Sequence, residues 1–284
     1  MRAAIGWSVA VFVGFWIVEA IVERLDAKRA LYRKLGTARK PGSIVSSNTS
    51  TIPRAALVEE MGEAFGRDFV ITHFFNPPRV MRLVEIVPGS DPAVVVRARA
   101  ACETLLGKTV VDCRDTPGFI ANRIGCHWMA VAAIEAMRMG LTVEEADAAM
   151  AAFGAPRTGV FGLLDLVGID LVPQVWGSLM ATLPAADDIH AFDLPGEQVV
   201  RDLIAAGRFG RKAKAGFYRQ GADRSRQALD LATGEYRAER PVKPADLPGG
   251  GRDLAALLAS GDRLGRYAWA VLSRVVAYSA EHAP

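Results

Sequence analysis

Residues 68–87 read DFVITHFFNPPRVMRLVEIV, and this stretch decides the fold class of the chain around it. Two runs rich in β-branched and aromatic residues, DFVITHFF and RLVEIV, flank the turn-forming Asn76-Pro77-Pro78. Short apolar runs bounded by turn residues are typical of buried β-strands. The stretch therefore predicts two strands joined by a short connection.

Further strands and helices alternate on both sides of this stretch. The predicted strands are WIVEAIV (16–22), GSIVSS (42–47) and KTVVDC (108–113). The predicted helices cover residues 24–36, with Gly36 as the stop signal, about 54–65, and 93–106. Alternation of this kind predicts an α/β fold, here a partial Rossmann-like, doubly wound sheet with parallel strands and crossover helices.

After Asp115 the pattern is helical only. Thr116-Pro117 is expected to open a helix that runs to Gly140, and Thr142 with Glu145 forms a capping box for the next, which ends at Gly154. Two more helices are predicted over 163–183 and 197–206, before a basic, glycine-containing segment at 210–218. The polar, Pro/Gly-rich residues 220–252 are interpreted as a linker, and 254–280 as an amphipathic piece of a further domain.

Composition excludes several classes of protein. The chain has 284 residues, of which 51% are hydrophobic and 23% charged, so it can bury a sizeable core. The net charge is only +3, which argues against a nucleic-acid binder. Three cysteines without a CxxC pair, and only four histidines, argue against a disulfide framework and a structural zinc site. This cysteine usage suits a reduced, cytoplasmic location.

The uncharged stretch 3–18, AAIGWSVAVFVGFWIV, leaves three interpretations open. It is short for a membrane span, which needs about 20 apolar residues. As a signal peptide it lacks a clean cleavage site. The third interpretation is a buried strand or helix, and we expect no membrane association.

His73 and Glu85 are the first candidates for chemistry. His73 lies near the end of one predicted strand and Glu85 in the next, and the turn between them can return the second strand beside the first. A carboxylate that accepts from one ring nitrogen raises the basicity of the other, as a general base requires. The alternative is a histidine paired with a glutamate only to satisfy a buried core.

Ser50, Asn122 and His127 are weaker candidates. Ser50 follows a strand at the sheet edge where ligands bind in open α/β folds, although a Ser/Asn turn is the simpler interpretation. Asn122 falls in the first turns of a helix, where its amide can donate toward the sheet edge or face solvent. His127 lies on the apolar stripe of that helix and is interpreted as a packed core residue.

Five segments occur together in one order: SSNTS, HFFNPPRVMRLVEIV, DTPGFIANRI, GLLDLVGID and GRKAKAGFY. From about Trp16 onward the chain resembles the NAD-dependent 3-hydroxyacyl-CoA dehydrogenase family, particularly its long multifunctional forms in fatty-acid β-oxidation. The resemblance implies that His73 is the general base, that Glu85 orients it, and that Ser50 and Asn122 hold the substrate oxygen. It also implies cofactor contacts for Glu23, Lys28, Ser50 and Asn76, and an acyl-CoA substrate.

The sequence departs from the family pattern in places. It contains no G-x-G-x-x-G motif, which in such folds holds the pyrophosphate of the dinucleotide. Residues 1–15 match nothing in the family, so we expect a chain truncated at both ends. The expected organisation is an unmatched segment (1–15), a partial NAD-binding domain (16–115), a helical dehydrogenase domain (116–219), a linker (220–252) and the start of a second helical domain (253–284).

Two functions follow from this organisation. The first is oxidation of an L-3-hydroxyacyl-CoA to the 3-ketoacyl-CoA with NAD, by a chain that forms a homodimer through its helical domain. The second is an inactive helical interaction module that persists without cofactor binding.

Overall fold

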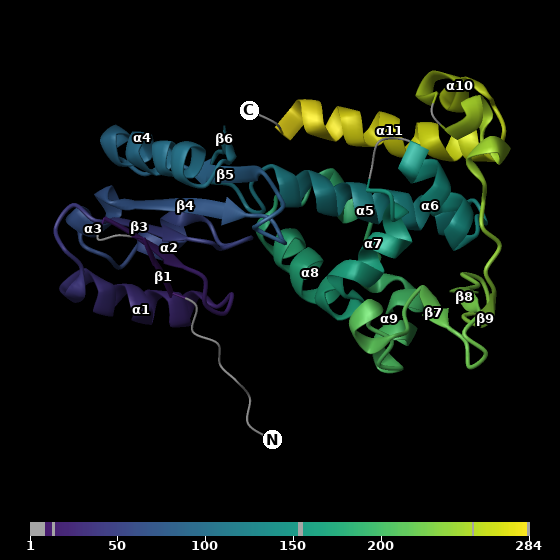
Figure 1. Ribbon diagram of the computed structural model, residues 1–284, viewed down its shortest axis with the longest axis horizontal. Coiled ribbons are helices and arrows are strands. Elements are labelled where there is room, and N and C mark those ends of the chain that lie inside the picture. Colours follow the sequence, from purple (N-terminus) through teal and green to yellow (C-terminus); the bar gives the residue numbers. More distant parts are fainter. Residues whose placement is uncertain (1–8, 13–14, 153–155, 252, 283–284) are drawn as a thin grey trace. The chain divides into compact units, whose positions relative to one another are not determined.

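The structure, a computed structural model, describes residues 9–12, 15–152, 156–251 and 253–282. The chain forms two compact units, residues 1–123 and 124–283 (Figure 1). The first is called here the sheet unit and the second the helical unit, and each is described by itself.

The sheet unit contains one six-stranded sheet and its covering helices. Its strands are β1 (Val9–Phe12), β2 (Trp16–Glu19), β3 (Ile44–Ser47), β4 (Phe69–Phe74), β5 (Leu83–Val87) and β6 (Thr109–Asp112). Its helices are α1 (Leu25–Ala38), α2 (Arg54–Val58), α3 (Glu63–Arg67) and α4 (Pro92–Ala100), the last continued by a π-helical turn at Ala101–Leu105.

The sheet has the strand order β1-β2-β3-β4-β5-β6. The pairs β2–β3, β3–β4 and β5–β6 are parallel, as the α/β pattern predicts. The pairs β1–β2 and β4–β5 are antiparallel, so parallel pairing dominates the sheet but does not extend to every pair. The short connection through Asn76-Pro77-Pro78 explains the second case, because a parallel return needs a crossover of a dozen or more residues.

Alternation along the strands divides the core of this unit between two faces. Val70 and Ile86 pack with residues of α4 on one face, which lies above the sheet in Figure 1. Val45 and Ile71 pack on the other face with Tyr32 of α1 and with residues of α2 and α3. Because neighbouring residues point to opposite faces, the central strands β3, β4 and β5 each contribute to both cores, as buried α/β strands do.

Two expected helix boundaries in this unit are wrong. Helix α1 runs through Gly36 to Ala38, because Gly36 does not take the positive φ with which a glycine ends a helix. The helix expected over 54–65 is two short helices, because Gly62 between them has an extended backbone (φ −62°, ψ 155°).

The helical unit begins within α5 (Ala121–Arg138). Helix α5 does not start at Thr116-Pro117 as expected, because Gly118 and Phe119 take positive φ angles of 74° and 52° and form a turn. The other long elements are α6 (Val143–Ala152), α7 (Gly159–Val167), α8 (Val172–Thr182), α9 (Gln198–Ala205), α10 (Leu254–Ala259) and α11 (Arg263–His282).

Other predictions for this unit meet mixed outcomes. The capping box is confirmed, since the Thr142 N–H donates to the Glu145 carboxylate at 2.9 Å and the Glu145 N–H to the Thr142 hydroxyl at 3.2 Å. The predicted end of that helix at Gly154 lies outside the described residues. The helix expected over 163–183 is broken at Gly168, whose φ is 109°. His127 is fully buried, as predicted, and bonds Asp188 at 2.9 Å.

The linker predicted over 220–252 is wrong. Residues 218–238 form an antiparallel sheet of three strands, β7 (Tyr218–Gln220), β8 (Arg226–Leu229) and β9 (Tyr236–Ala238). Ala228 and Leu229 of β8 are buried in the main helical core. Leu231 and Tyr236 pack against the same core, so the segment is held in the unit by apolar residues that its polar composition hides.

Residues 254–282 belong to the same unit. Tyr267 and Val271 of α11 lie in the core that α5 to α9 share. The Tyr267 hydroxyl also donates to the carbonyl oxygen of Ala132 in α5 at 2.9 Å. These helices are thus packed on the first helical domain in this structure.

Part of the apolar N-terminal stretch joins the sheet. Residues 9–12 form β1, which pairs antiparallel with β2, whereas residues 1–8, 13 and 14 lie outside the described part. In the described part of the chain, no single helix is long and apolar enough to cross a membrane. One pair, Gly159–Val167 and Ile169–Thr182, meets the length and composition together but is bent by 79°.

Candidate active site

His73 and Glu85 face each other across β4 and β5. They occupy directly opposed positions in the antiparallel register, where side chains on one face come close together. The His73 Nδ1 atom lies 2.7 Å from a carboxylate oxygen of Glu85, and the two side chains are 6% and 1% exposed. The predicted juxtaposition of imidazole and carboxylate is therefore present.

Glu85 also caps the start of helix α5. Its second carboxylate oxygen accepts the backbone N–H of Ile120 at 3.0 Å and that of Ala121 at 2.7 Å. The turn at Gly118 and Phe119 aims these two groups at the carboxylate, which satisfies donors that a helix start leaves unpaired. Sequence reasoning missed this second role, although the Pro117-Gly118 pair was a turn signal.

The His73 ring is held between aromatic neighbours and has one nitrogen to spare. Phe75 packs edge-on against it with ring centroids 4.7 Å apart, and Phe119 lies at 5.8 Å. Among the described residues, none hydrogen-bonds the His73 Nε2 atom. Because an ionised carboxylate only accepts, Nδ1 carries the proton and Nε2 presents its lone pair, which is the arrangement of a general base.

Cys113 lies next to this pair. Burial and the charge of Glu85 raise the pKa of the Cys113 thiol to about 12. The thiol thus stays protonated at neutral pH and is no nucleophile.

Glu23, Ser50 and Asn122 come together at the carboxyl ends of β2 and β3. One Glu23 oxygen accepts the backbone N–H groups of Ser50 at 2.8 Å and Thr51 at 3.1 Å. The Asn122 amide donates to the Ser50 carbonyl oxygen at 3.2 Å. The Ser50 hydroxyl has no hydrogen-bond partner within the described chain, so it is available to a ligand.

Lys28 forms an ion pair with Glu23. Its ammonium is 1% exposed and lies 2.9 Å from Glu19 and 3.2 Å from Glu23. Burial alone would raise the pKa of Glu23, but Lys28 and the hydrogen bonds from residues 49–51 outweigh it, and the pKa is lowered. The Lys28 ammonium is therefore buried against Glu19 and Glu23 and does not reach the surface. In this structure Lys28 positions Glu23, which is itself one of the predicted cofactor contacts.

Glu19 and Asn48 are two polar residues that sequence reasoning missed. The Glu19 carboxylate is fully buried and accepts from the hydroxyls of Tyr32 at 2.6 Å and Ser47 at 2.7 Å. The Asn48 side chain accepts the N–H of Phe74 at 2.9 Å and so fixes the end of β4. Asn76 follows that end and is exposed, and within the described chain it forms no hydrogen bond with the other predicted residues.

Two family models match the chain in succession. Residues 9–116 match the NAD-binding domain of 3-hydroxyacyl-CoA dehydrogenase, and residues 118–220 match its C-terminal domain. The chain belongs to the 3-hydroxyacyl-CoA dehydrogenase family. The match begins at residue 9, so the expectation that nothing before Trp16 resembles the family is wrong for residues 9–15.

Individual relatives support the assignment of the chain to this family. A probable 3-hydroxybutyryl-CoA dehydrogenase of Deinococcus radiodurans is 35% identical over 72% of this chain and 70% of its own length. A putative fatty acid oxidation complex trifunctional enzyme of Rickettsia prowazekii is 34% identical over 92% of this chain but only 36% of its own length. The solved 3-hydroxybutyryl-CoA dehydrogenase of Escherichia coli has 31% identity and a TM-score of 0.60, covering 71% of this chain and 41% of that one.

The chain thus spans about a third of the length of the first such relatives, at 36%, 37% and 34%. The family's cofactor is NAD, and the polar residues predicted to contact it follow the carboxyl ends of the strands, where open α/β sheets bind ligands. Strands β2, β3 and β4 run parallel, and their carboxyl ends carry Glu23, Ser50 and Asn76. The chain has no G-x-G-x-x-G segment to hold the pyrophosphate.

Proposed function

We propose that this chain oxidises an L-3-hydroxyacyl-CoA to the 3-ketoacyl-CoA with NAD, as a step of fatty-acid β-oxidation. One observation carries the proposal: the His73 Nδ1 atom is 2.7 Å from Glu85, and its Nε2 atom has no partner within the described chain. A buried imidazole fixed at one nitrogen and open at the other is the group that alcohol oxidation requires.

In this proposal His73 removes the proton of the substrate 3-hydroxyl. The proton passes to Nε2 as the C3–H bond breaks, its electron pair leaves as hydride, and the C3–O bond becomes a carbonyl. Glu85 stabilises the imidazolium that forms, since its carboxylate lies against Nδ1 and both side chains are buried. The aromatic rings of Phe75 and Phe119 keep the imidazole in its plane.

Ser50 and Asn122 would hold the reacting oxygen in line. The Asn122 amide uses one N–H for the Ser50 carbonyl oxygen, which leaves a second N–H for the substrate. The Ser50 hydroxyl can donate to the same oxygen. Bound NAD supplies the hydride acceptor, and Glu23, Ser50 and Asn76 are the residues that would hold its nicotinamide end.

Turnover and cofactor binding test this proposal separately. NADH formation from L-3-hydroxybutyryl-CoA and NAD is expected to fall about 100-fold to 10,000-fold in His73→Gln. NADH fluorescence titration measures cofactor binding in both proteins and should give equal affinities. Unchanged turnover in His73→Gln would contradict the assignment. A folded chain that binds no NADH at millimolar concentration would favour an inactive helical interaction module instead.

We also propose that the chain forms a homodimer through its helical unit and works in the cytoplasm. Leu166, Val167 and Leu171 leave apolar side chains exposed on that unit, as an interface requires. The three cysteines are free and buried, which suits a reducing compartment. Light scattering coupled to size-exclusion chromatography would show a mass of twice 30.5 kDa, whereas a monomer at micromolar concentration would contradict the dimer.

A further inference from the structure

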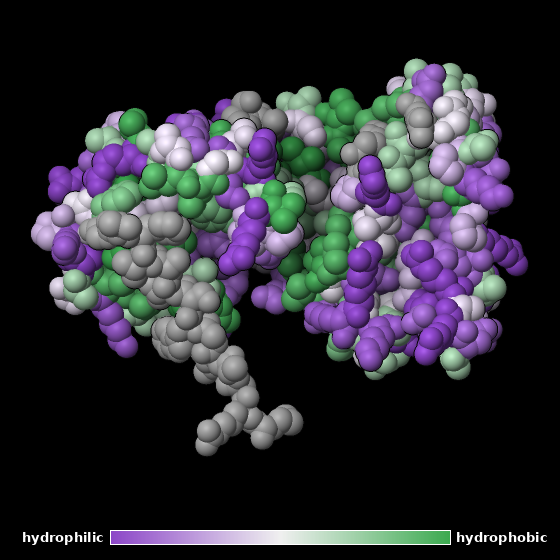
Figure 2. Space-filling view, in the orientation of Figure 1, coloured by the Kyte–Doolittle hydropathy of each residue, from purple (hydrophilic) through white to green (hydrophobic). Residues whose placement is uncertain are grey.

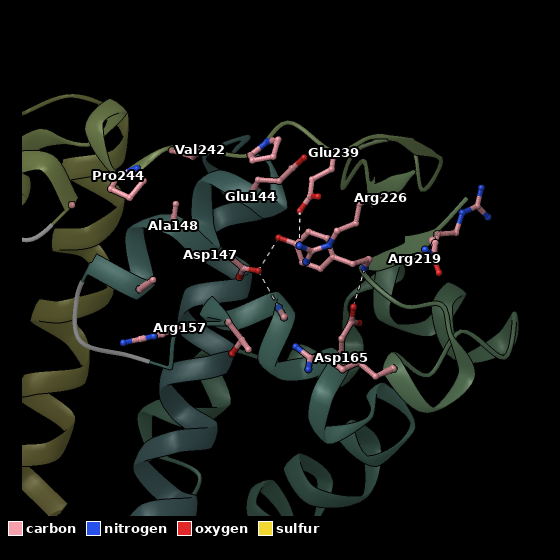
Figure 3. A pocket seen from close by; sticks show the side chains of 18 of the residues that line it. Glu144, Asp147, Ala148, Arg157, Asp165, Arg219, Arg226, Glu239, Val242 and Pro244 are labelled. Atoms are coloured by element: carbon pink, nitrogen blue, oxygen red, sulfur yellow. Dashed lines mark hydrogen bonds and ion pairs between the residues drawn. The ribbon is translucent and has the colours of Figure 1, made fainter. Parts of the chain in front are cut away.

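A cavity of about 1400 Å³ opens in the helical unit (Figure 3). It lies between α6, the start of α7, the sheet β7–β9 and the segment 241–251. No residue of the sheet unit lines it, so it is separate from the site at His73 and Glu85.

Basic side chains dominate the charged lining of this cavity. Six of its lining residues are cations: Arg157, Arg211, Lys214, Arg219, Arg224 and Arg226. Only Arg226 forms an ion pair within the described chain, with Glu239 at 3.4 Å. The surface over β7–β9 is correspondingly hydrophilic (Figure 2). The remaining five cations form no ion pair in the part of the chain that the structure describes.

The four lining carboxylates offset only part of this positive charge. Glu144 is neutralised by Arg237, whose two nitrogens lie 2.7 and 2.8 Å from its oxygens, and Glu239 is used by Arg226. Hydrogen bonds occupy both Asp147 and Asp165, and Figure 3 shows those that come from other lining residues. Asp147 accepts from the N–H groups of Phe161 and Gly162 and from the hydroxyl of Tyr218.

Asp165 is occupied in the same way, since it accepts the N–H groups of Phe217 and Tyr218 at 2.8 and 2.9 Å. Burial raises the pKa of Asp147 to about 7 and that of Asp165 to about 6. Together they carry less than two full negative charges near neutral pH. The cavity therefore keeps an excess of positive charge, which only a ligand or solvent ions can neutralise.

Two of the guanidinium groups pack on neighbouring tyrosine rings before any ligand arrives. The Arg226 guanidinium lies over the Tyr218 ring at 5.2 Å, on the strand next to it. The Arg219 guanidinium lies over the Tyr236 ring at 3.8 Å, and its Nε donates to the Gln227 side chain at 2.7 Å. Preorganised guanidinium groups favour phosphate, which they bind with two parallel hydrogen bonds.

We propose that this cavity binds a small ligand bearing two or more phosphate groups. A single phosphate carries a charge of about −2 and would leave part of the excess positive charge unneutralised, and about 1400 Å³ exceeds the space that a drug-sized ligand needs. The shared chemistry is a phosphate chain, whether inorganic or part of a nucleotide. This site is independent of the proposed dehydrogenase activity.

Isothermal titration calorimetry of the full chain tests the proposal with two probes, inorganic tripolyphosphate and adenosine triphosphate, which carry the same phosphate chain without and with a nucleoside. The double variant Arg157→Gln/Arg211→Gln removes two cations that form no ion pair within the described chain. The matched control Lys34→Gln/Lys40→Gln removes two exposed charges of the sheet unit. We expect the affinity for at least one probe to fall about 100-fold in the cavity variant and less than about threefold in the control, because a hydrogen bond to a charged group contributes roughly tenfold or more.

The outcomes separate the possibilities. Binding of both probes indicates recognition of the phosphate chain alone, and binding of the nucleotide only indicates a nucleotide source. Equal loss in the cavity and control variants, or no binding of either probe at about 10 mM in about 0.05 M salt, would overturn the proposal. Circular dichroism checks that the cavity variant is folded, and Lys214→Gln provides a second variant should it not be.

Discussion

Replacing Glu85 by glutamine separates its effect on His73 from its effect on helix α5. The carbonyl oxygen of the new amide can still accept the N–H groups of Ile120 and Ala121, which lie 3.0 and 2.7 Å from one carboxylate oxygen. The amide nitrogen then replaces the oxygen that faces His73 at 2.7 Å. Because that nitrogen donates, Nδ1 must accept and the proton must move to Nε2. The imidazole then has no lone pair for the substrate.

The size of both effects follows from these contacts. Loss of the general base lowers kcat by about 100-fold to 10,000-fold. The stability loss is smaller, because one charge-assisted hydrogen bond weakens and the negative charge at a helix start disappears. Those changes cost about 1–3 kcal/mol of the free energy of unfolding, which an ordinary domain tolerates.

NADH formation measures the first effect and urea denaturation the second. Nitrogen NMR of the His73 ring adds a readout that does not depend on turnover, since Glu85→Gln should move the proton from Nδ1 to Nε2. Glu103→Gln is the matched control, as an exposed carboxylate paired with Arg99 at 3.2 Å. A folded Glu85→Gln protein with kcat within about threefold of the parent and an unchanged His73 tautomer would refute the reasoning.

Three further predictions concern the helical unit. Gly210→Ala should lower the free energy of unfolding, measured by urea denaturation, by about 3 kcal/mol or more. The reason is that φ is 91° and a Cβ would lie 2.3 Å from the Asp165 carbonyl oxygen. The control Gly207→Ala, at φ 68° with nothing within 4 Å of the Cβ, should lower it by about 1 kcal/mol. The pKa of Asp147 rises on folding from 3.8 to about 7, so the folded protein holds a proton that the unfolded chain releases between these values. The contribution of Asp147 to the free energy of unfolding is therefore fully present below about pH 4. It is lost as pH increases to about 7, at up to about 1.4 kcal/mol per pH unit. Denaturation at about pH 5 and about pH 8 should show this fall, and Asp147→Asn should reduce it several-fold. Tyr267→Phe should cost about 1 kcal/mol, because the buried hydroxyl donates to Ala132 at 2.9 Å; no change in midpoint would contradict the packing of α11 against α5.

Local sequence patterns predict the sheet unit well because its strands are short apolar runs between turn residues. The turn at Asn76-Pro77-Pro78 also predicts the juxtaposition of His73 and Glu85, since an antiparallel return fixes the register. The patterns fail where a backbone angle decides the outcome. Gly36, Gly62 and Gly168 are alike in the sequence, yet one continues a helix, one separates two helices and one breaks a predicted helix.

The second role of Glu85 could not be predicted for a different reason. Its carboxylate is paired with backbone N–H groups 35 and 36 residues away, and backbone groups carry no sequence signal. The same holds for Glu19, whose buried network with Lys28, Tyr32 and Ser47 joins three elements. Side-chain pairs within one hairpin can be inferred from spacing, whereas contacts between distant segments depend on the packing of the whole unit.

Residues 220–252 have the composition of a linker, but those that the structure describes form part of the folded helical unit. Their many charges, prolines and glycines predict a linker, because such residues cannot bury enough surface to fold alone. The strands form nevertheless, since Ala228 and Leu229 insert into an existing core and leave the polar residues outward. Arg224 and Arg226, which made the segment look like a linker, then line the cavity. Because Ala228 and Leu229 enter the core, the charged residues of the segment can stay at the surface without being buried. The segment can therefore present its cations to the proposed phosphate ligand while it remains part of the folded unit.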